Sequence, residues 1–167
     1  MKVALCIFLI TIFSLTAHSR DWVSPIDIKY STQSPDNFER FFKARAILDS
    51  WRGQQSKFDE AYGLLDQILS NDQTFAPAYR ELGRLFIMAG YINSSQTMKE
   101  GTNLAEQAIL KSIEFEPEYA DAHMLLGHLY TVTKKYKTAA AYLSNAETFG
   151  TKSPWLFVNW GALYEEQ

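Results

Sequence analysis

Apolar residues recur along most of this chain at intervals of three and four positions, the spacing that gathers side chains on one face of an α-helix. The series Tyr136, Ala139, Leu143 and Ala146 is a clear example. The pattern predicts an all-α fold. The expected helices lie at about 35–52, 57–70, 76–89, 98–115, 119–132, 135–148 and 154–166.

Residues with special backbone preferences mark several ends of these helices. Ser34-Pro35 and Ser153-Pro154 each place an N-cap side chain before a proline at the first helical position. Gly53, Gly90 and Gly150 stand where helices are expected to stop, since glycine is common just beyond a helix C-terminus. These signals agree with the helices that the spacing of apolar residues predicts.

A short motif returns along the chain at a fixed interval. Gly127 and Gly161 stand 34 residues apart, and each has a tyrosine three positions later, at Tyr130 and Tyr164. Leu82-Gly83 repeats the motif further upstream. A period of 34 residues with a Leu-Gly-x-x-Tyr core is typical of tetratricopeptide repeats, in which each unit is one helix pair.

On these motifs the chain resembles the tetratricopeptide repeat family over about residues 42–167. The resemblance implies an α-solenoid of antiparallel helix pairs, in which a small residue such as Gly127 lets the two helices of a pair approach closely. It implies three complete units and a terminal half unit, at 42–75, 76–119, 120–153 and 154–167.

Two of these units depart from the family pattern. The distance between Gly83 and Gly127 is 44 residues, so the second unit carries ten extra residues, which we expect in a surface loop after Gly90. In the first unit Asp49 stands in place of the glycine and Arg52 in place of the aromatic residue. That unit is therefore the most degenerate of the three.

The first nineteen residues are typical of a cleaved export signal. Lys2 precedes a thirteen-residue apolar run at 3–15, and Ala17-His18-Ser19 offers a cleavage site. A membrane anchor is one alternative, although the run is shorter than the roughly 20 residues that span a bilayer. Lipid attachment at Cys6, the only cysteine, is another. We expect a signal peptide at 1–19, an extended arm at 20–34 and a helical domain at 35–167, periplasmic or secreted and without a stable membrane span.

Composition and charge exclude some classes of function. The chain is 47% hydrophobic and 21% charged, which is ordinary for a globular protein. Loss of Lys2 with the signal leaves 15 basic and 19 acidic residues, a net charge of −4. This balance does not resemble the basic patch of a nucleic-acid-binding protein.

No signature of catalysis or of a cofactor stands out. His123 and His128 are five positions apart on one expected helix, about 140° apart around its axis, so we do not expect a shared metal ion. Glu114, Glu116 and Glu118 are interpreted as a solvated turn rather than as catalytic carboxylates. We expect a protein that is not an enzyme and carries no cofactor or metal.

The family resemblance implies that the first helix of each unit lines a concave groove for a protein or peptide. Arg80 and Arg84 lie one turn apart and could grip a carboxylate; a solvated face paired with neighbours such as Glu81 is the alternative. The groove positions of the second and third units hold Arg80, Arg84, Asp121, Met124, His128 and Thr131.

The last expected helix is unusually apolar. Its aromatic residues are Trp155, Phe157, Trp160 and Tyr164. Three interpretations stay open: a cap that turns its aromatic residues inward, a docking face for another chain or a second copy, or part of a longer array. A sequon at Asn93 makes glycosylation a further possibility.

These features predict an exported, non-enzymatic scaffold or adaptor that binds a protein or peptide partner in its groove. One alternative is a structural component of a cell-envelope or exopolysaccharide export assembly that docks through the aromatic C-terminal helix. Another is the N-terminal fragment of a longer tetratricopeptide repeat protein.

Overall fold

The computed structural model describes residues 32, 34–90 and 95–165, and in this part of the chain the regular structure is entirely helical. The all-α prediction is confirmed, and each expected helix is present with ends within three residues of those predicted. The helices are α1 (Pro35–Ser50), α2 (Gln55–Asn71), α3 (Ala76–Gly90), α4 (Ser95–Phe115), α5 (Ala120–Val132), α6 (Tyr136–Thr148) and α7 (Trp155–Glu165).

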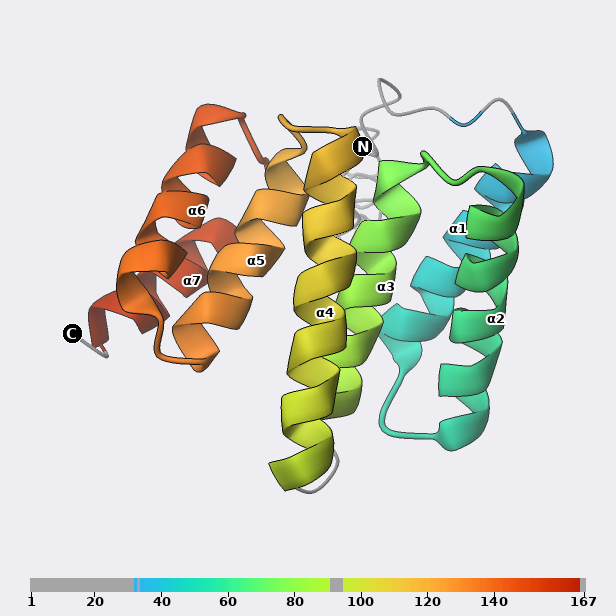
Figure 1. Ribbon diagram of the computed structural model, residues 1–167, viewed down its shortest axis with the longest axis horizontal. Helices are drawn as coiled ribbons and strands as arrows, with labels where there is room; N and C mark the ends of the chain where they lie inside the picture. Colours follow the sequence, from blue (N-terminus) through green and yellow to red (C-terminus); the bar gives the residue numbers. More distant parts are fainter. Residues whose placement is uncertain (1–31, 33, 91–94, 166–167) are drawn as a thin grey trace, which may run out of the picture.

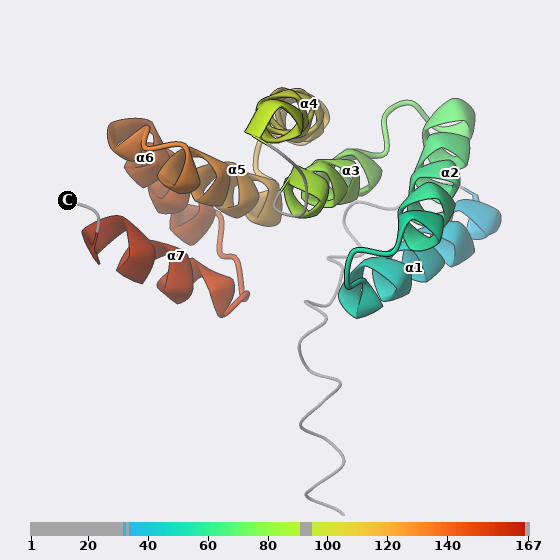
Figure 2. The same cartoon turned by 90° about the horizontal axis from the view of Figure 1, so that it is seen from below.

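Consecutive helices pack as pairs, α1 with α2, α3 with α4 and α5 with α6, and the pairs lie side by side (Figure 1). Seen from below, α1, α3, α5 and α7 follow one side of the molecule and α2, α4 and α6 follow the other (Figure 2). We call these the inner row and the outer row. Neighbouring helices of the inner row contact one another along its whole length, and α7 packs against both α5 and α6.

Two apolar clusters hold the pairs together, and α3 contributes to both. Phe41 of α1 and Leu65 of α2 are fully buried in the first cluster together with Leu85 of α3. The second cluster extends from Ile87 of α3 to Leu163 of α7. Helix α3 thus lies between the two clusters, and each pair buries its apolar face against the next.

The small residues of the repeated motif lie where the two helices of a pair cross. A Cβ atom on Gly127 would lie 2.6 Å from Cδ2 and 2.7 Å from Cγ of Leu143 on α6. A Cβ atom on Gly83 would collide in the same way with Ile109 on α4. At the corresponding Gly161 of α7, no described atom lies within 4 Å of such a Cβ.

The predicted helix ends match in part, because α7 begins at Trp155 rather than at Pro154 and Gly90 is itself the last residue of α3. The Oγ atom of Ser34 accepts a hydrogen bond from the backbone N–H of Asn37 at 3.4 Å, as an N-cap does. Gly53 and Gly150 have φ angles of 96° and 80°, the left-handed conformation that glycine adopts without strain.

The prediction that the ten extra residues form a surface loop after Gly90 is wrong for the last six of them. Residues 95–100 belong to α4, which has 21 residues where α6 has 13. The physical reason is local, because Gln96, Met98, Lys99 and Glu100 are good helix formers and extend the helix. Asn93 of the sequon, the signal peptide at 1–19 and most of the arm at 20–34 lie outside the described residues.

Two glycine substitutions test the role of the helix crossing. Gly127→Ala places a methyl group against Leu143 and is expected to lower the free energy of unfolding by about 1–3 kcal/mol. Gly161→Ala has open space and is expected to raise it by about 0.5–1 kcal/mol, through helix propensity alone. Urea denaturation measures both, and equal shifts of the two variants would contradict the close crossing.

Candidate functional site

Polar contacts connect neighbouring helices of the inner row. The Nη2 atom of Arg84 on α3 donates to Oδ1 of Asp49 on α1 at 2.6 Å. The Nδ1 atom of His128 on α5 lies 2.8 Å from Oδ1 of Asn159 on α7. These contacts link α1 to α3 and α5 to α7.

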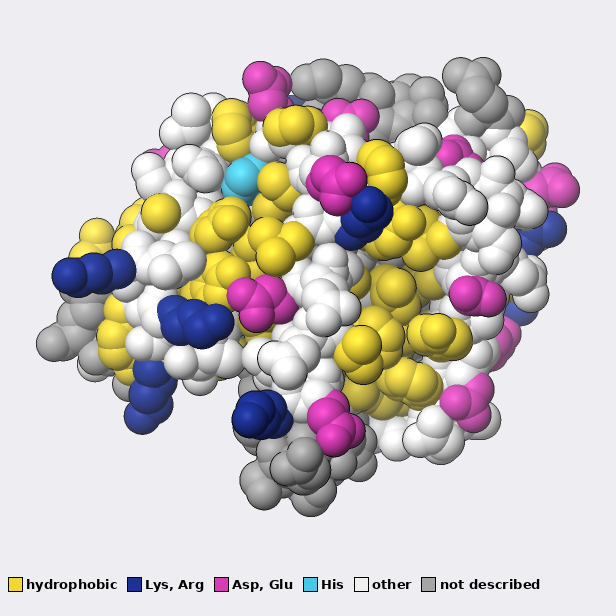
Figure 3. Space-filling model, viewed as in Figure 1, with side chains coloured by type: hydrophobic (Ala, Val, Ile, Leu, Met, Phe, Trp, Pro, Cys, Tyr) yellow, Lys and Arg dark blue, Asp and Glu magenta, His cyan; other side chains and the backbone are white. Residues whose placement is uncertain are grey.

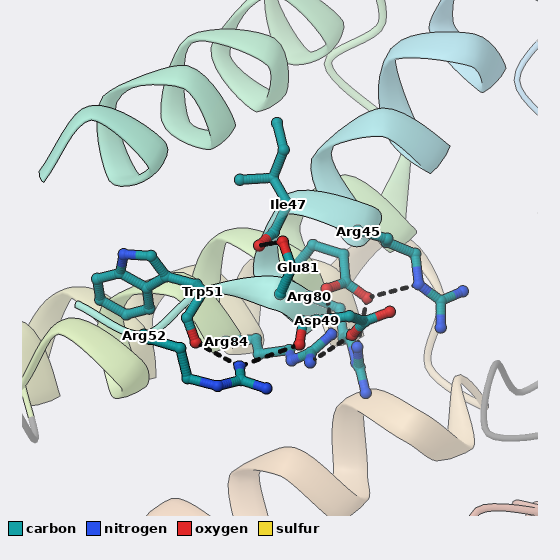
Figure 4. Close-up of polar contacts among 9 residues, drawn as sticks. Arg45, Ile47, Asp49, Trp51, Arg52, Arg80, Glu81 and Arg84 are labelled. Carbon is teal, nitrogen blue, oxygen red and sulfur yellow. Dashed lines mark hydrogen bonds and ion pairs between the residues drawn. The ribbon is translucent and has the colours of Figure 1, made fainter. Parts of the chain in front are cut away.

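A buried carboxylate lies at the centre of the α1–α3 contact. Glu81 is 1% exposed, and three arginines surround it (Figure 4). Arg80 Nη1 and Arg84 Nη1 donate hydrogen bonds to its two carboxylate oxygens, the second at 3.4 Å. Arg45 Nε of α1 forms an ion pair with Oε1 at 3.4 Å. We call Arg45, Arg80, Glu81, Arg84 and Asp49 the arginine cluster.

The arginines keep this buried carboxylate ionised. Burial alone would raise the pKa of Glu81, but the charges of Arg80, Arg84 and Arg45 and the hydrogen bond from Arg80 together lower it. Burial likewise disfavours the charged form of Arg80, but its interactions with Glu81, Tyr119 and Asp121 together outweigh burial, so the pKa of Arg80 is raised. Glu81 and Arg80 are therefore both charged at neutral pH.

The charges of the cluster nearly balance, because Asp121 of α5 also acts on Arg80. The cluster contains three arginines against Glu81 and Asp49, of which Asp49 is 46% exposed and Glu81 is buried. Figure 4 shows the terminal nitrogens of Arg45 directed away from the carboxylate of Glu81. The side chain of Arg45 is 12% exposed, whereas that of Arg84 is 25% exposed.

Most of the remaining residues predicted to line the groove are buried or hydrogen-bonded within the protein. Met124 is 3% and Thr131 is 5% exposed, and the hydroxyl of Thr131 donates to the carbonyl oxygen of Gly127 at 3.0 Å. Asp121 accepts a hydrogen bond from Thr151 Oγ1 at 2.6 Å. Of the two predicted arginines, Arg84 is the more exposed, with 25% of its side-chain surface accessible against 11% for Arg80.

Arg45 and Asp49 belong to the cluster, although sequence reasoning did not select them. They stand four positions apart on α1 and so share a helix face. Asp49 departed from the family pattern because it replaced a glycine, and it pairs with Arg84 of the next helix pair. The signal in the sequence was Asp49 itself, a charged residue at a position where the family pattern has a small one.

The two rows differ in character. The face of the outer row is shown in Figure 3, where apolar side chains gather on both sides of α4 and charged side chains are scattered. Tyr62 of α2 and Leu104 and Leu110 of α4 are exposed apolar residues of these helices. The arginine cluster, by contrast, joins two helices of the inner row.

The aromatic residues predicted to form a C-terminal docking face are only partly turned inward. Trp155, Phe157 and Tyr164 are 57%, 76% and 69% exposed. Trp160 packs against the second apolar cluster and stacks on Tyr164 with ring centroids 5.8 Å apart. The face of α7 that packs into the core is formed by Leu156, Asn159 and Leu163.

Comparison with known proteins adds no relative. No family model matches the chain, and no curated protein matches it. Among the helices that the structure describes, none is long and apolar enough to cross a membrane.

Removal of the central carboxylate tests the electrostatics of the cluster. Glu81→Gln removes the carboxylate that contacts Arg45 and Arg80 and leaves Arg84 with Asp49 alone, and it is expected to lower the free energy of unfolding by about 3–5 kcal/mol. Asp49→Asn removes an exposed partner and is expected to lower it by at most about 1 kcal/mol. Urea denaturation at pH 7 measures both, and equal effects would contradict the central role of Glu81.

The stability difference between wild type and Glu81→Gln should depend on pH. The pKa of Glu81 is lower in the folded than in the unfolded chain, so its contribution to stability is complete above the unfolded pKa of about 4.3. It is lost as the pH falls through the folded pKa. The difference in unfolding free energy between wild type and Glu81→Gln should therefore shrink in acid, and a difference that grows below pH 4 would contradict this assignment.

Proposed function

We propose that the protein is a non-enzymatic, exported scaffold of the tetratricopeptide type that binds a protein or peptide partner along its inner row. The repeated motif with a period of 34 residues supports the type of repeat, and the three stacked helix pairs agree with it. The apolar run at 3–15 supports export.

The arginine cluster carries the proposal of partner binding. It lies at the junction of two inner-row helices and is held in position by a buried carboxylate, and its Arg84 is partly exposed. Fixed guanidinium groups bind carboxylates well because their geometry matches and little side-chain entropy is lost on binding. The partner that fits best is an acidic segment, which would lie along α1 and α3 and contact Arg84, the most exposed arginine of the cluster.

The difference in burial between the two predicted arginines determines which one can be tested. Arg80 is 11% exposed and donates directly to Glu81, so its substitution would disturb folding. Arg84 is 25% exposed, and its second contact is with the exposed Asp49. Arg84 is therefore the position at which binding can be changed with less effect on the core.

A charge reversal tests the preference for acidic ligands. A fluorescein-labelled peptide rich in glutamate is expected to bind the protein at low salt, and Arg84→Glu should weaken that binding at least about tenfold, since like charges repel. Lys137→Glu on α6 makes the same change in net charge on the outer row and serves as the control. Fluorescence anisotropy gives the dissociation constants of both variants. If both variants lose affinity equally, the loss reflects the change in net charge and not a site at Arg84.

A cross-linking experiment tests the adaptor function itself. The tagged protein is cross-linked in its native compartment as wild type, Arg84→Glu and Lys137→Glu. We expect one discrete protein adduct in wild type and in Lys137→Glu that is absent in Arg84→Glu. An adduct pattern that is identical in all three would contradict binding at the arginine cluster.

A further inference from the structure

Three helices carry an aromatic residue, a glycine and a second aromatic residue at the same spacing. The glycine follows the first aromatic residue by four positions and precedes the second by three, which places all three on one helix face. We call each set a triad. The triads are Tyr79, Gly83 and Phe86 on α3, His123, Gly127 and Tyr130 on α5, and Phe157, Gly161 and Tyr164 on α7.

Helix α4 covers Tyr79 and Gly83 of the triad of α3, while the ring of Phe86 lies 6.3 Å from that of Tyr62 on α2. Ile109 packs directly over Gly83, where it occupies the space of a Cβ atom. The ring of Phe115, at the C-terminal end of α4, stacks on Tyr79 with centroids 5.6 Å apart. The end of the covering helix thus meets the beginning of the covered one, so the two run antiparallel.

Helix α6 covers the triad of α5 in the same way. Leu143 packs over Gly127, and Phe149, just beyond the end of α6, lies 5.0 Å from the ring of His123. Tyr142 contacts the rings of both His123 and Tyr130, at 5.7 and 5.5 Å. As a result, His123 is only 4% and Tyr130 only 7% exposed.

The two covering helices share one sequence pattern, which we call the covering pattern. A small residue is followed after four positions by isoleucine or leucine, after three more by another small residue, and after three more by phenylalanine. The small residues are fully buried, because they lie where the two helix backbones approach most closely. The pattern is formed by Ala105, Ile109, Ser112 and Phe115 and again by Ala139, Leu143, Ala146 and Phe149.

No described residue covers the third triad. Phe157 and Tyr164 of α7 are 76% and 69% exposed, and the space around Gly161 is open. The other face of α7 is occupied, since Leu156 and Leu163 are buried against the rest of the molecule. Helix α7 is therefore apolar on two faces.

We propose that the triad of α7 is a docking site for an amphipathic helix of another protein that carries the covering pattern. The helix would lie antiparallel to α7. Its leucine or isoleucine would pack over Gly161 and its phenylalanine against Phe157, as Leu143 and Phe149 do on α5. The proposal goes beyond binding at the inner row and does not depend on it.

A second copy of this chain does not provide such a helix. The covering helices α4 and α6 are already packed on their own triads, and the two leucines of α7 are buried in its own core. The exposed apolar area is also small for a dimer. With about 150–250 Å² for each aromatic side chain, Trp155, Phe157 and Tyr164 present roughly 300–500 Å², against about 800 Å² per partner in a standard stable interface.

A helical peptide with the sequence of residues 135–150 of this chain is the probe, because it contains the whole covering pattern. A lactam between Lys137 and Ala141→Glu, both at exposed positions of α6, keeps it helical in water, where short helices are otherwise marginal. The fluorescein-labelled peptide is titrated with the full-length protein and followed by anisotropy. We expect a dissociation constant on the order of 10–100 µM, as suits a small interface. The Leu143→Asp form of the peptide should bind at least about tenfold more weakly.

Two protein variants and a control locate the peptide. Gly161→Leu fills the open space and Phe157→Ala removes the most exposed ring of the triad, and each should weaken binding at least about tenfold. Both positions are exposed, so the fold should persist, which circular dichroism checks. Gly63→Leu on α2, where a side chain also has open space, should bind the peptide like wild type.

The outcomes that overturn the proposal are distinct. Unchanged binding to Gly161→Leu would show that the peptide binds at another site. One such site is α5, where the peptide could displace α6, whose sequence it shares. Absence of binding up to about 1 mM would show that the triad does not select this pattern. Sedimentation of the protein alone provides a further test, because a dimer that Phe157→Ala dissociates would assign the face to a second copy.

Discussion

The close crossing of two helices over a glycine is the contact on which the rest of this structure depends. Ile109 over Gly83 and Leu143 over Gly127 let the helix backbones approach until the apolar faces of a pair close on each other. Each closed pair still has one apolar face, which the next pair covers, so the crossing leads directly to the stack. The aromatic residues on either side of the glycine extend the same contact along the helix.

The buried carboxylate of Glu81 has a different role from these apolar contacts. An apolar face allows some sliding between helices, whereas a charge that is 1% exposed requires its partners in fixed positions. Arg45 of α1 and Arg80 and Arg84 of α3 supply them, so the register of α1 against α3 is tied to charge pairing. The same arrangement holds three guanidinium groups in place at the inner row, which is the condition for the proposed recognition of an acidic segment.

The two proposed surfaces follow from opposite chemical requirements. The arginine cluster is polar and largely buried, and the proposed partner would bring a carboxylate to Arg84, its most exposed arginine. The triad of α7 is apolar and open, and it lacks only the helix that α5 has in α6. One protein with both surfaces could hold two different partners at once.

Local patterns in the sequence determined most of the fold. The spacing of apolar residues predicted all seven helices, and Ser34, Gly53 and Gly150 predicted helix ends, because these features depend on neighbours within one or two turns. The ten extra residues were harder to place. A repeat pattern of fixed length indicates that residues have been added but not in which conformation, and good helix formers extended α4 instead of a loop.

The site shows the limit of such reasoning. Helix geometry alone places Arg80 and Arg84 on one face, but the contact of Arg84 with Asp49 spans 35 residues and exists only because α1 packs against α3. Met124 and Thr131 are buried in the packed stack, and repeat numbering alone could not show how little of them remains exposed. The sequence by itself determined which segments are helical and which residues face each other within a helix, since both are set by bonds over a few residues. Only the tertiary structure decided which charges are neutralised and which aromatic faces stay open, because burial depends on helices that are distant in the chain.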